Sequence, residues 1–326
     1  MTNQTDSTNL HTSKPTFRGW ESYLKWAIMI AAYVFLAYKL ITFKQYDQLL
    51  EWWQQMPLTQ FWWLAAVVLL VPLNWLIEAI KWEMLTANIQ KISLLTSIKA
   101  VLAGISTGFF TPNRVGEFVG RILYLNAENR KSGATMGIVN SLTQNLVMAL
   151  CGIPACLVYF YSTTNILNLD IENFILILLT FVVFSGLLYF YLPKLSKFLV
   201  QTNIGAEIKG FTVGLSAYTQ ADLVRIMGVS FLRYLVFCTQ FFLMLSFFGI
   251  QLDPIEAIIA IPTNYLFVTF SPSVAFSEAA IRSSYAVLFI GSYSGQVVNI
   301  ALAGVCIWAV NFVIPMLVGS FFLVRT

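Results

Sequence analysis

The chain has 326 residues, of which 58% are hydrophobic and only 10% are charged, with a formal net charge of +4. About a quarter of the residues of a soluble globular domain are charged, so this composition excludes that class and indicates an integral membrane protein. The only histidine, His11, lies in a polar segment near the N-terminus. Histidine-based zinc sites and a Ser-His catalytic triad therefore have no histidine in the apolar part of the chain.

The N-terminal region begins with a polar tail over residues 1–22, followed by an apolar run at 24–42. This run lacks a small-residue cleavage site, so it predicts an uncleaved anchor and not a signal peptide. A helix of about 18 apolar residues or more is long enough to cross a bilayer. Six spans are predicted on this basis, at residues 24–42, 61–80, 134–160, 173–192, 223–248 and 296–323.

Two further apolar stretches, 94–125 and 255–291, are each interrupted by a proline-containing motif. Arms of roughly 12–17 residues would be about 18–25 Å long as helix, whereas the hydrocarbon core is about 30 Å thick. The pattern favours an all-α fold with six transmembrane helices and two re-entrant helical hairpins. Eight spans are the alternative.

The distribution of charge predicts the orientation. If the N-terminus is cytoplasmic and each interrupted stretch returns to the side it left, thirteen basic residues lie in the cytoplasm and only Lys39 and Lys44 outside. By the positive-inside rule, both termini are then cytoplasmic. We expect a multi-pass protein of a bacterial inner (plasma) membrane, with one transmembrane domain over residues 23–325.

The two halves of this domain have the same order of elements. Residues 24–160 are predicted as span, span, hairpin and span beginning inside, and residues 173–323 repeat that order beginning outside. Inverted-topology repeats of this kind bring interrupted helices together near the middle of the membrane. We therefore expect the two hairpins to enter from opposite faces and to meet there.

The first interruption combines Thr111 and a proline with Glu117 and Arg121. The i, i+4 spacing lets the last two pair on one helix face. Arg114 lies near the start of the second helical arm, where free N–H groups and the helix dipole favour an anion such as phosphate. The alternative is that the pair only neutralises itself and fixes the hairpin.

The second interruption repeats the pattern, with Ser271 and a proline before Glu278 and Arg282. The alternative here is a serine-rich turn that caps its own helix. Because the same combination follows two separate helix breaks, we interpret both as parts of one polar site inside the membrane.

Other polar residues lie within the predicted spans. Arg233 must meet an acid, a carbonyl or water in the membrane, and Glu117 and Glu278 are its candidate partners. Asn74 and Glu78 could line the same cavity, although for Glu78 we expect pairing with Lys81 at the cytoplasmic boundary. A polar stripe that we interpret as a helix–helix contact comprises Asn140, Gln144 and Asn145.

The four cysteines lie in apolar runs without metal-ligand spacing. We expect free, buried thiols, no metal, no cofactor and no nucleic-acid partner. A nucleotide-binding signature is also absent from the sequence, which argues against ATP-driven pumping within this chain.

These motifs make residues 20–325 resemble the lysylphosphatidylglycerol synthase transmembrane, or flippase-like, family. The first family signature is a Pro-Gly-Arg-x-Gly-Glu segment followed by an Arg, and the matching residues are Pro112, Arg114, Gly116, Glu117 and Arg121. Asn113 replaces the glycine of that signature, and Arg121 falls one position late. The second signature is a Ser-Pro-Gly-Gly turn before a Glu, to which Ser271, Pro272 and Glu278 are similar without the two glycines.

The resemblance implies an inner-membrane protein that binds or moves phospholipid-like molecules. Lysyl-transferring members carry a soluble catalytic domain, which we do not expect in a chain that ends at Thr326, directly after its last predicted span. The leading hypothesis is binding and translocation, without enzymatic activity, of an anionic phospholipid or polyprenyl-phosphate-type lipid through a midplane polar cavity. The predicted substrate-binding residues are Arg114, Glu117, Arg121, Glu278, Arg282, Arg233, Thr111 and Ser271.

Two alternatives belong to other classes of protein. A membrane-embedded lipid-modifying enzyme would use Glu117 or Glu278 as a general base. A non-catalytic partner of an envelope lipid-synthesis complex would have no activity alone. The sequence does not predict an oligomeric state.

Overall fold

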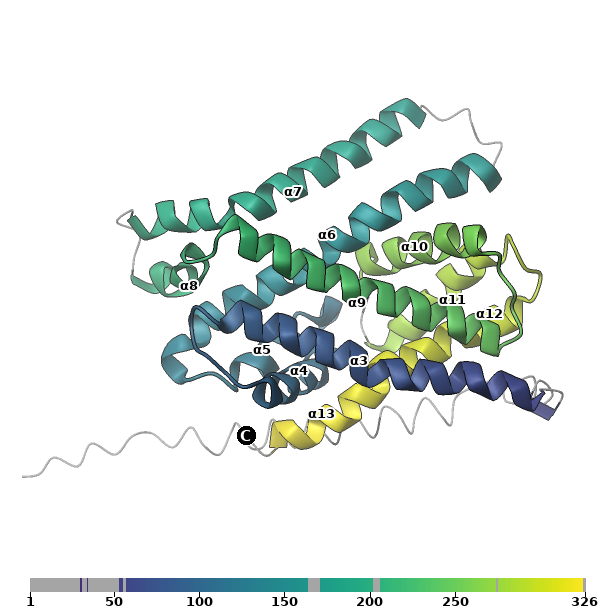
Figure 1. Cartoon of the computed structure of the whole chain (residues 1–326), viewed down its shortest axis with the longest axis horizontal. Helices are drawn as coiled ribbons and strands as arrows, with labels where there is room; N and C mark the ends of the chain where they lie inside the picture. The colour runs from purple at the N-terminus through teal and green to yellow at the C-terminus, as the bar shows by residue number, and fades with distance from the viewer. Residues whose placement is uncertain are drawn as a thin grey trace, which may run out of the picture.

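The computed structural model describes residues 57–163, 171–201, 206–273 and 275–324, and also residues 30, 34, 53 and 54. Within this part of the chain, all regular secondary structure is helical (Figure 1). The predicted polar tail 1–22 and first span 24–42, apart from positions 30 and 34, lie outside the described residues. The helices are η1 Leu58–Gln60, α3 Phe61–Thr86, α4 Leu94–Phe109, η2 Pro112–Arg114, α5 Glu117–Ile122, η3 Ala127–Asn129, α6 Arg130–Thr163, α7 Ile171–Gln201, α8 Ala206–Ser216, α9 Gln220–Phe247, α10 Pro254–Phe270, α11 Ala275–Ile290, α12 Val297–Trp308, η4 Ala309–Val313 and α13 Ile314–Val324.

Five helical segments of the described chain are long and apolar enough to cross a membrane. They are Leu58–Thr86, Ala127–Thr163, Thr180–Leu199, Gln220–Phe247 and Val297–Leu323. Each overlaps one of the predicted spans, so the class of an all-α membrane protein is confirmed.

The two interrupted stretches fold as pairs of shorter helices. α4 and α5 form the first pair, and α10 and α11 form the second. The predicted arm length is wrong for α5, which has only six residues and is about 9 Å long. The helix ends early because the next amides bond three residues back, from Tyr124 N to Arg121 O and from Leu125 N to Ile122 O, before α6 begins.

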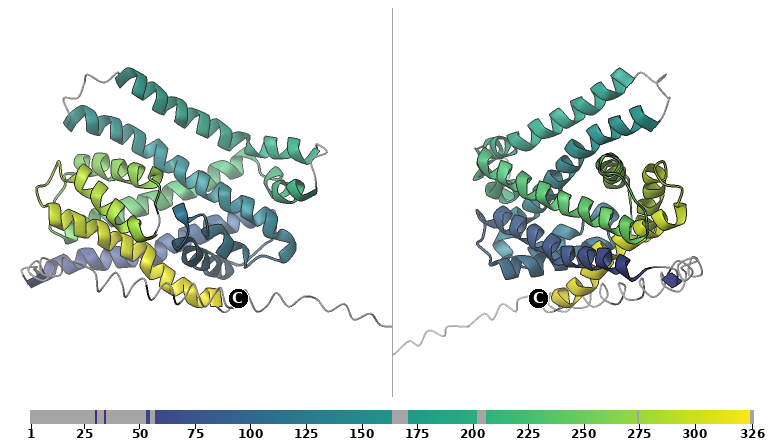
Figure 2. Two further views of the ribbon diagram at one scale, coloured as in Figure 1. Left: turned by 180° about the vertical axis from the view of Figure 1, so that it is seen from behind. Right: turned by 45° about the vertical axis from the view of Figure 1, so that its right-hand side comes forward.

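The two helix pairs lie at opposite ends of the long helices. In Figure 1, α4, α5 and α8 lie together at one end of α3, α6 and α9, whereas α10 and α11 lie toward the other. α3 packs against α9, α4 packs against α13, and α10 packs against α6. Seen from behind, α12 and α13 run as one bent segment from the α10 end of the molecule toward the α4 end (Figure 2).

Glycines allow α4 and α5 to pack with their backbones close together. A Cβ added to Gly120 would collide with Ala103 O and Thr107 Oγ1, and one added to Gly116 would collide with Thr107 O. Close approach at small residues is the usual way in which membrane helices associate without hydrophobic driving force. The side chain of Thr107 completes the contact, because its Oγ1 donates to Gly116 O at 2.8 Å and accepts from Gly120 N at 3.1 Å.

Candidate functional site

The turn between α4 and α5 has a left-handed backbone at two consecutive residues. Asn113 has φ +48° and Arg114 has φ +59°. Such angles are unusual for non-glycine residues, and Asn adopts them more readily than most. Thr111 fixes the turn, because its Oγ1 donates to Gly108 O at 2.9 Å and accepts from Gly116 N at 2.8 Å. The predicted substrate contact of Thr111 therefore competes with two bonds that the hydroxyl makes to its own turn.

The turns of the two helix pairs touch each other. Asn113 N donates to Ser273 O at 2.9 Å, and Ser273 N donates to Asn113 Oδ1 at 2.8 Å. Ser271, the second hydroxyl residue predicted for the site, instead shares a 2.8 Å hydrogen bond with the Tyr285 hydroxyl. The two interruptions, 160 residues apart in sequence, thus form one structural unit.

Ion pairs extend from this junction in both directions. Arg114 contacts Glu278 at 3.2 Å and Glu117 at 3.5 Å. The two predicted i, i+4 pairs are present, Arg121–Glu117 at 3.1 Å and Arg282–Glu278 at 3.0 Å. Arg114 therefore has acidic partners on both helix pairs, of which Glu117 is local and Glu278 is distant in sequence.

The series of ion pairs continues into the long helices through Glu78 of α3. Its carboxylate lies 2.7 Å from Arg121, 2.8 Å from Arg233 and 2.9 Å from Lys81. One prediction is wrong and one is confirmed. Arg233 pairs with Glu78 and not with Glu117 or Glu278, because α9 packs against α3. Glu78 and Lys81 pair as predicted, and both side chains are buried inside the protein.

Amide side chains join the same network, as expected for helix–helix contacts. Asn140 Nδ2 donates to Glu78 at 2.8 Å, Gln144 Oε1 accepts from Lys81 at 3.3 Å, and Asn74 Oδ1 accepts from Arg233 Nε at 3.0 Å. Asn145, the third member of the predicted polar stripe, is exposed.

We call these eight ionised residues the charge network. Its members are Glu78, Lys81, Arg114, Glu117, Arg121, Arg233, Glu278 and Arg282. Five of them are cationic and three are carboxylates, which leaves an excess of two positive charges. Ion pairs inside an apolar environment are stable only when charges and hydrogen bonds are well matched. The excess therefore makes the network a natural binding site for an anion.

The charge network has a closed part and a partly open part. The side chains of Lys81, Glu78 and Arg121 are at most 2% exposed. In contrast, Arg114 is 21% exposed and Arg282 is 15% exposed. In both of these arginines Nε is buried and has no hydrogen-bond partner among the described residues. Each of these two arginines thus keeps one buried donor that no described protein group satisfies.

An aromatic ring lies under both of these arginines. The guanidinium carbons of Arg114 and Arg282 are 3.4 and 4.5 Å from the centre of the Phe312 ring, within the range of cation–π attraction. Phe312 belongs to η4, a single π-helical turn inside the last span, and such turns often occur at functional sites. Just before it, Trp308 Nε1 donates to Glu278 at 3.3 Å.

Sequence reasoning did not identify Phe312 or Trp308. Both are aromatic residues in an apolar span, and nothing in their spacing marks them. A small cavity of about 60 Å³ adjoins Phe312 and is also lined by Asn311, Arg282 and Thr269, among others.

Comparison with known proteins gives one match. A family model described as "Lysylphosphatidylglycerol synthase TM region" matches residues 24–319 of the chain. No curated protein and no solved structure matches the chain. The matched range includes every residue of the charge network.

Proposed function

Because the chain belongs to the lysylphosphatidylglycerol synthase TM region family, we propose that it binds an anionic lipid head group inside the membrane and translocates that lipid. The observation that carries the proposal is the excess of two positive charges in the charge network as a whole, in which Arg114 and Arg282 are partly exposed. Phosphate, of a phospholipid or of a polyprenyl carrier, supplies the missing negative charge. Arginine suits this role because its planar fork of donors matches phosphate oxygens.

The residues of the network take different roles in this proposal. Arg114 and Arg282 contact the phosphate, and Glu117 and Glu278 hold the two guanidinium groups in place. Arg121 is 2% exposed and lies between Glu78 and Glu117, so we assign it to positioning and not to the direct contact first considered. Arg233, 16% exposed, extends the positive surface along α9.

The transport part of the proposal depends on opposed hairpins. α5 is too short to cross a core of about 30 Å, which supports a re-entrant first pair, and the two turns are in contact. The packing of the halves is also alike: α4 packs on α13 next to Gly319, and α10 packs on α6 next to Gly152. These likenesses support an inverted repeat in which a head group passes between two hairpins that enter from opposite faces.

Basic residues support the orientation that we propose. Lys91, Arg130, Lys131 and Arg225 lie in or beside the connections at the end of the molecule where α4, α5 and α8 lie, and the connection 249–253 at the other end has an acid and no base. The end with the basic residues is therefore the cytoplasmic one, in a bacterial inner membrane.

The proposal is tested by translocation of a head-group-labelled anionic phospholipid in proteoliposomes. Arg114→Ala and Arg282→Ala should each lower the rate at least tenfold. Arg225→Ala is the matched control, because Arg225 is 73% exposed and only approaches Asp222, at 3.9 Å. Unchanged transport in both of the first two variants would overturn the phosphate role.

One observation favours a second candidate, a membrane-embedded lipid-modifying enzyme. At 24% exposure, the Glu117 side chain is the most accessible carboxylate of the network, and a general base must reach its substrate. Turnover of a head group by the purified protein, lost in Glu117→Gln, would support this candidate. The absence of both turnover and transport, together with copurification of a lipid-synthesis enzyme, would support a role as a non-catalytic partner.

A further inference from the structure

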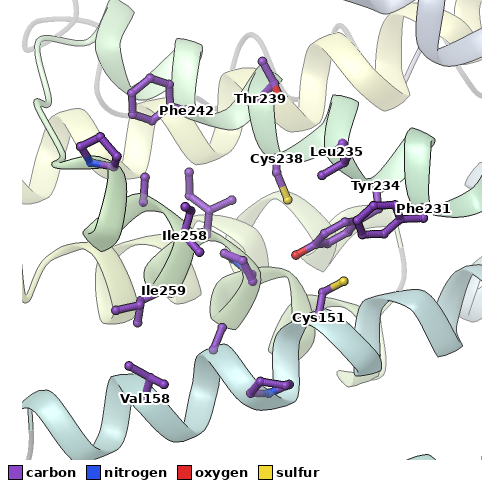
Figure 3. Close-up of a pocket in the computed structure, with 16 residues that line it drawn as sticks. Cys151, Val158, Phe231, Tyr234, Leu235, Cys238, Thr239, Phe242, Ile258 and Ile259 are labelled. Atoms are coloured by element: carbon purple, nitrogen blue, oxygen red, sulfur yellow. The ribbon is translucent and has the colours of Figure 1, made fainter.

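A large apolar pocket lies between α6, α9 and α10, outside the charge network. Its volume is about 640 Å³, which falls within the roughly 300–1,000 Å³ of typical ligand sites. Figure 3 shows Val158 of α6, Leu235 of α9 and Ile258 of α10 among its lining side chains. None of the described residues that line it is ionised, so the pocket suits an uncharged hydrocarbon.

The pocket is elongated along the helices. On α9 its lining extends from Phe231 to Phe242, a separation of eleven positions that corresponds to about 16 Å of helix. This length is about half of a hydrocarbon core of roughly 30 Å. An acyl chain that spans one leaflet has about the same length. The rim is accessible from the apolar surroundings, because Ile258 is 70% exposed and Val158 is 48% exposed.

On each of its three helices the pocket lies within one helical turn of the small cavity that Arg282 lines. On α6 Met148 lines the small cavity beside Arg282, and Cys151 lines the pocket. On α10 the same step separates Tyr265, which lines the cavity, from Pro262, which lines the pocket. On α9 the pocket lining lies on both sides of Phe237, with Tyr234 three residues before it and Cys238 directly after it.

Two aromatic side chains, Phe237 of α9 and Tyr265 of α10, line the small cavity near the pocket. The rings of Phe237 and Tyr265 have centres 6.3 Å apart, and the Tyr265 hydroxyl donates to Phe237 O at 3.1 Å. Both of these side chains line the cavity that Arg282 also lines. A hydrocarbon chain in the pocket would therefore end beside the groups that we assign to the phosphate.

We propose that this pocket binds one acyl chain of an anionic phospholipid whose phosphate lies at Arg114 and Arg282. The inference rests on the proposed function, and it adds a site for the tail to the site for the head group. The tail occupies the half of the membrane toward the N-terminal end of α10. This arrangement corresponds to an intermediate stage of transport. The phospholipid has entered from the leaflet at the α4–α5 end, and its head group has moved from the membrane surface to the charge network.

The test is photo-crosslinking with phosphatidylglycerol that carries a diazirine in one acyl chain, in vesicles of phosphatidylcholine that contain the full chain. A label near the glycerol should modify residues near Tyr234, and a label near the end of the chain should modify residues near Val158. Ala155→Trp, which fills the pocket, should lower labelling of the lining at least fivefold. The matched control Ala65→Trp places the same side chain on an exposed part of α3 and should leave the labelling unchanged.

Uniform labelling over all lipid-facing helices, or labelling that Ala155→Trp does not reduce, would overturn the tail site. If Ala155→Trp does not fold, Val158→Trp at the rim provides the same comparison.

The two proposals can fail separately. In the first case the pocket is labelled specifically, but Arg114→Ala and Arg282→Ala transport lipid at an unchanged rate. This result would support the tail site and exclude the proposed head-group role. Loss of transport in those variants with uniform labelling would retain the head-group role and remove the tail site.

Discussion

Arg114 and Glu278, 164 residues apart in sequence, form an ion pair of 3.2 Å that connects the two helix pairs. Each partner also belongs to a local pair, with Glu117 and Arg282 respectively. The contact thus connects two short-range ion pairs into the charge network, and it does so where the two turns meet. Any movement that separates the helix pairs must break this contact.

Glu278→Gln should destabilise the protein, because it leaves Arg114 and Arg282 with one carboxylate fewer between them. Removing one partner of a buried ion pair costs about 3–5 kcal/mol. The loss should appear as a lower midpoint of thermal unfolding in neutral detergent, and phosphatidylglycerol should restore more of it than in the unmodified protein. An equally stable Glu278→Gln would contradict the assigned pairing. Arg225→Gln, on the exposed surface, should have little effect.

Glu78 and Lys81 should show strong energetic coupling. Glu78→Gln leaves three cations without their common carboxylate, so we expect a loss of about 3–5 kcal/mol in the free energy of unfolding. The addition of Lys81→Met removes one of those cations and should recover part of the loss. Chemical or thermal unfolding of the two single variants and the double variant measures the coupling. Additive effects would show that the two charges do not interact.

Asn113 should tolerate glycine better than alanine. Its φ of +48° costs an alanine about 1–2 kcal/mol, whereas glycine adopts it freely. Both variants lose the hydrogen bond from Ser273 N to Oδ1, so the difference between them isolates the backbone conformation. The midpoints of thermal unfolding of Asn113→Gly and Asn113→Ala measure this difference. Equal midpoints would argue against a left-handed turn.

Phe312→Leu should weaken binding of an anionic head group while the protein still folds. Loss of the ring removes cation–π attraction to two guanidinium groups, for which we expect about 1–2 kcal/mol, or roughly 5- to 30-fold in Kd. Titration with a short-chain phosphatidylglycerol measures the change. Phe321→Leu removes a ring that is 53% exposed and serves as the control. An unchanged Kd in Phe312→Leu would exclude a positioning role for the ring.

Gly120→Ala should separate α4 from α5. The new methyl group would collide with the backbone at Ala103, and steric conflict of this kind costs roughly 1–3 kcal/mol. Gly228→Ala on α9, where nothing lies within 4 Å of the added Cβ, should be neutral or stabilising by up to about 1 kcal/mol. Thermal unfolding distinguishes the two variants. Equal behaviour would contradict the close packing of α4 and α5.

The sequence predicted the local features of this site. Glu117–Arg121 and Glu278–Arg282 pair because residues four apart share one face of any α-helix. The five long apolar helices in the described part of the chain were also predicted, since their length and composition depend on the sequence alone. The sequence did not predict the short length of α5, because an apolar pattern does not mark where the backbone changes from i, i+4 to i, i+3 hydrogen bonds.

The sequence alone therefore determined a helical membrane protein with two interrupted stretches that each carry an acid–base pair. Only the tertiary structure decided how those pairs connect. Glu78 meets Arg233 across 155 positions of sequence, and Phe312 meets Arg114 across 198. Contacts of this kind depend on which helices pack together and at what rotation. In an apolar chain many packings satisfy the hydrophobic pattern equally well, and the charge network becomes visible only when one of them is specified.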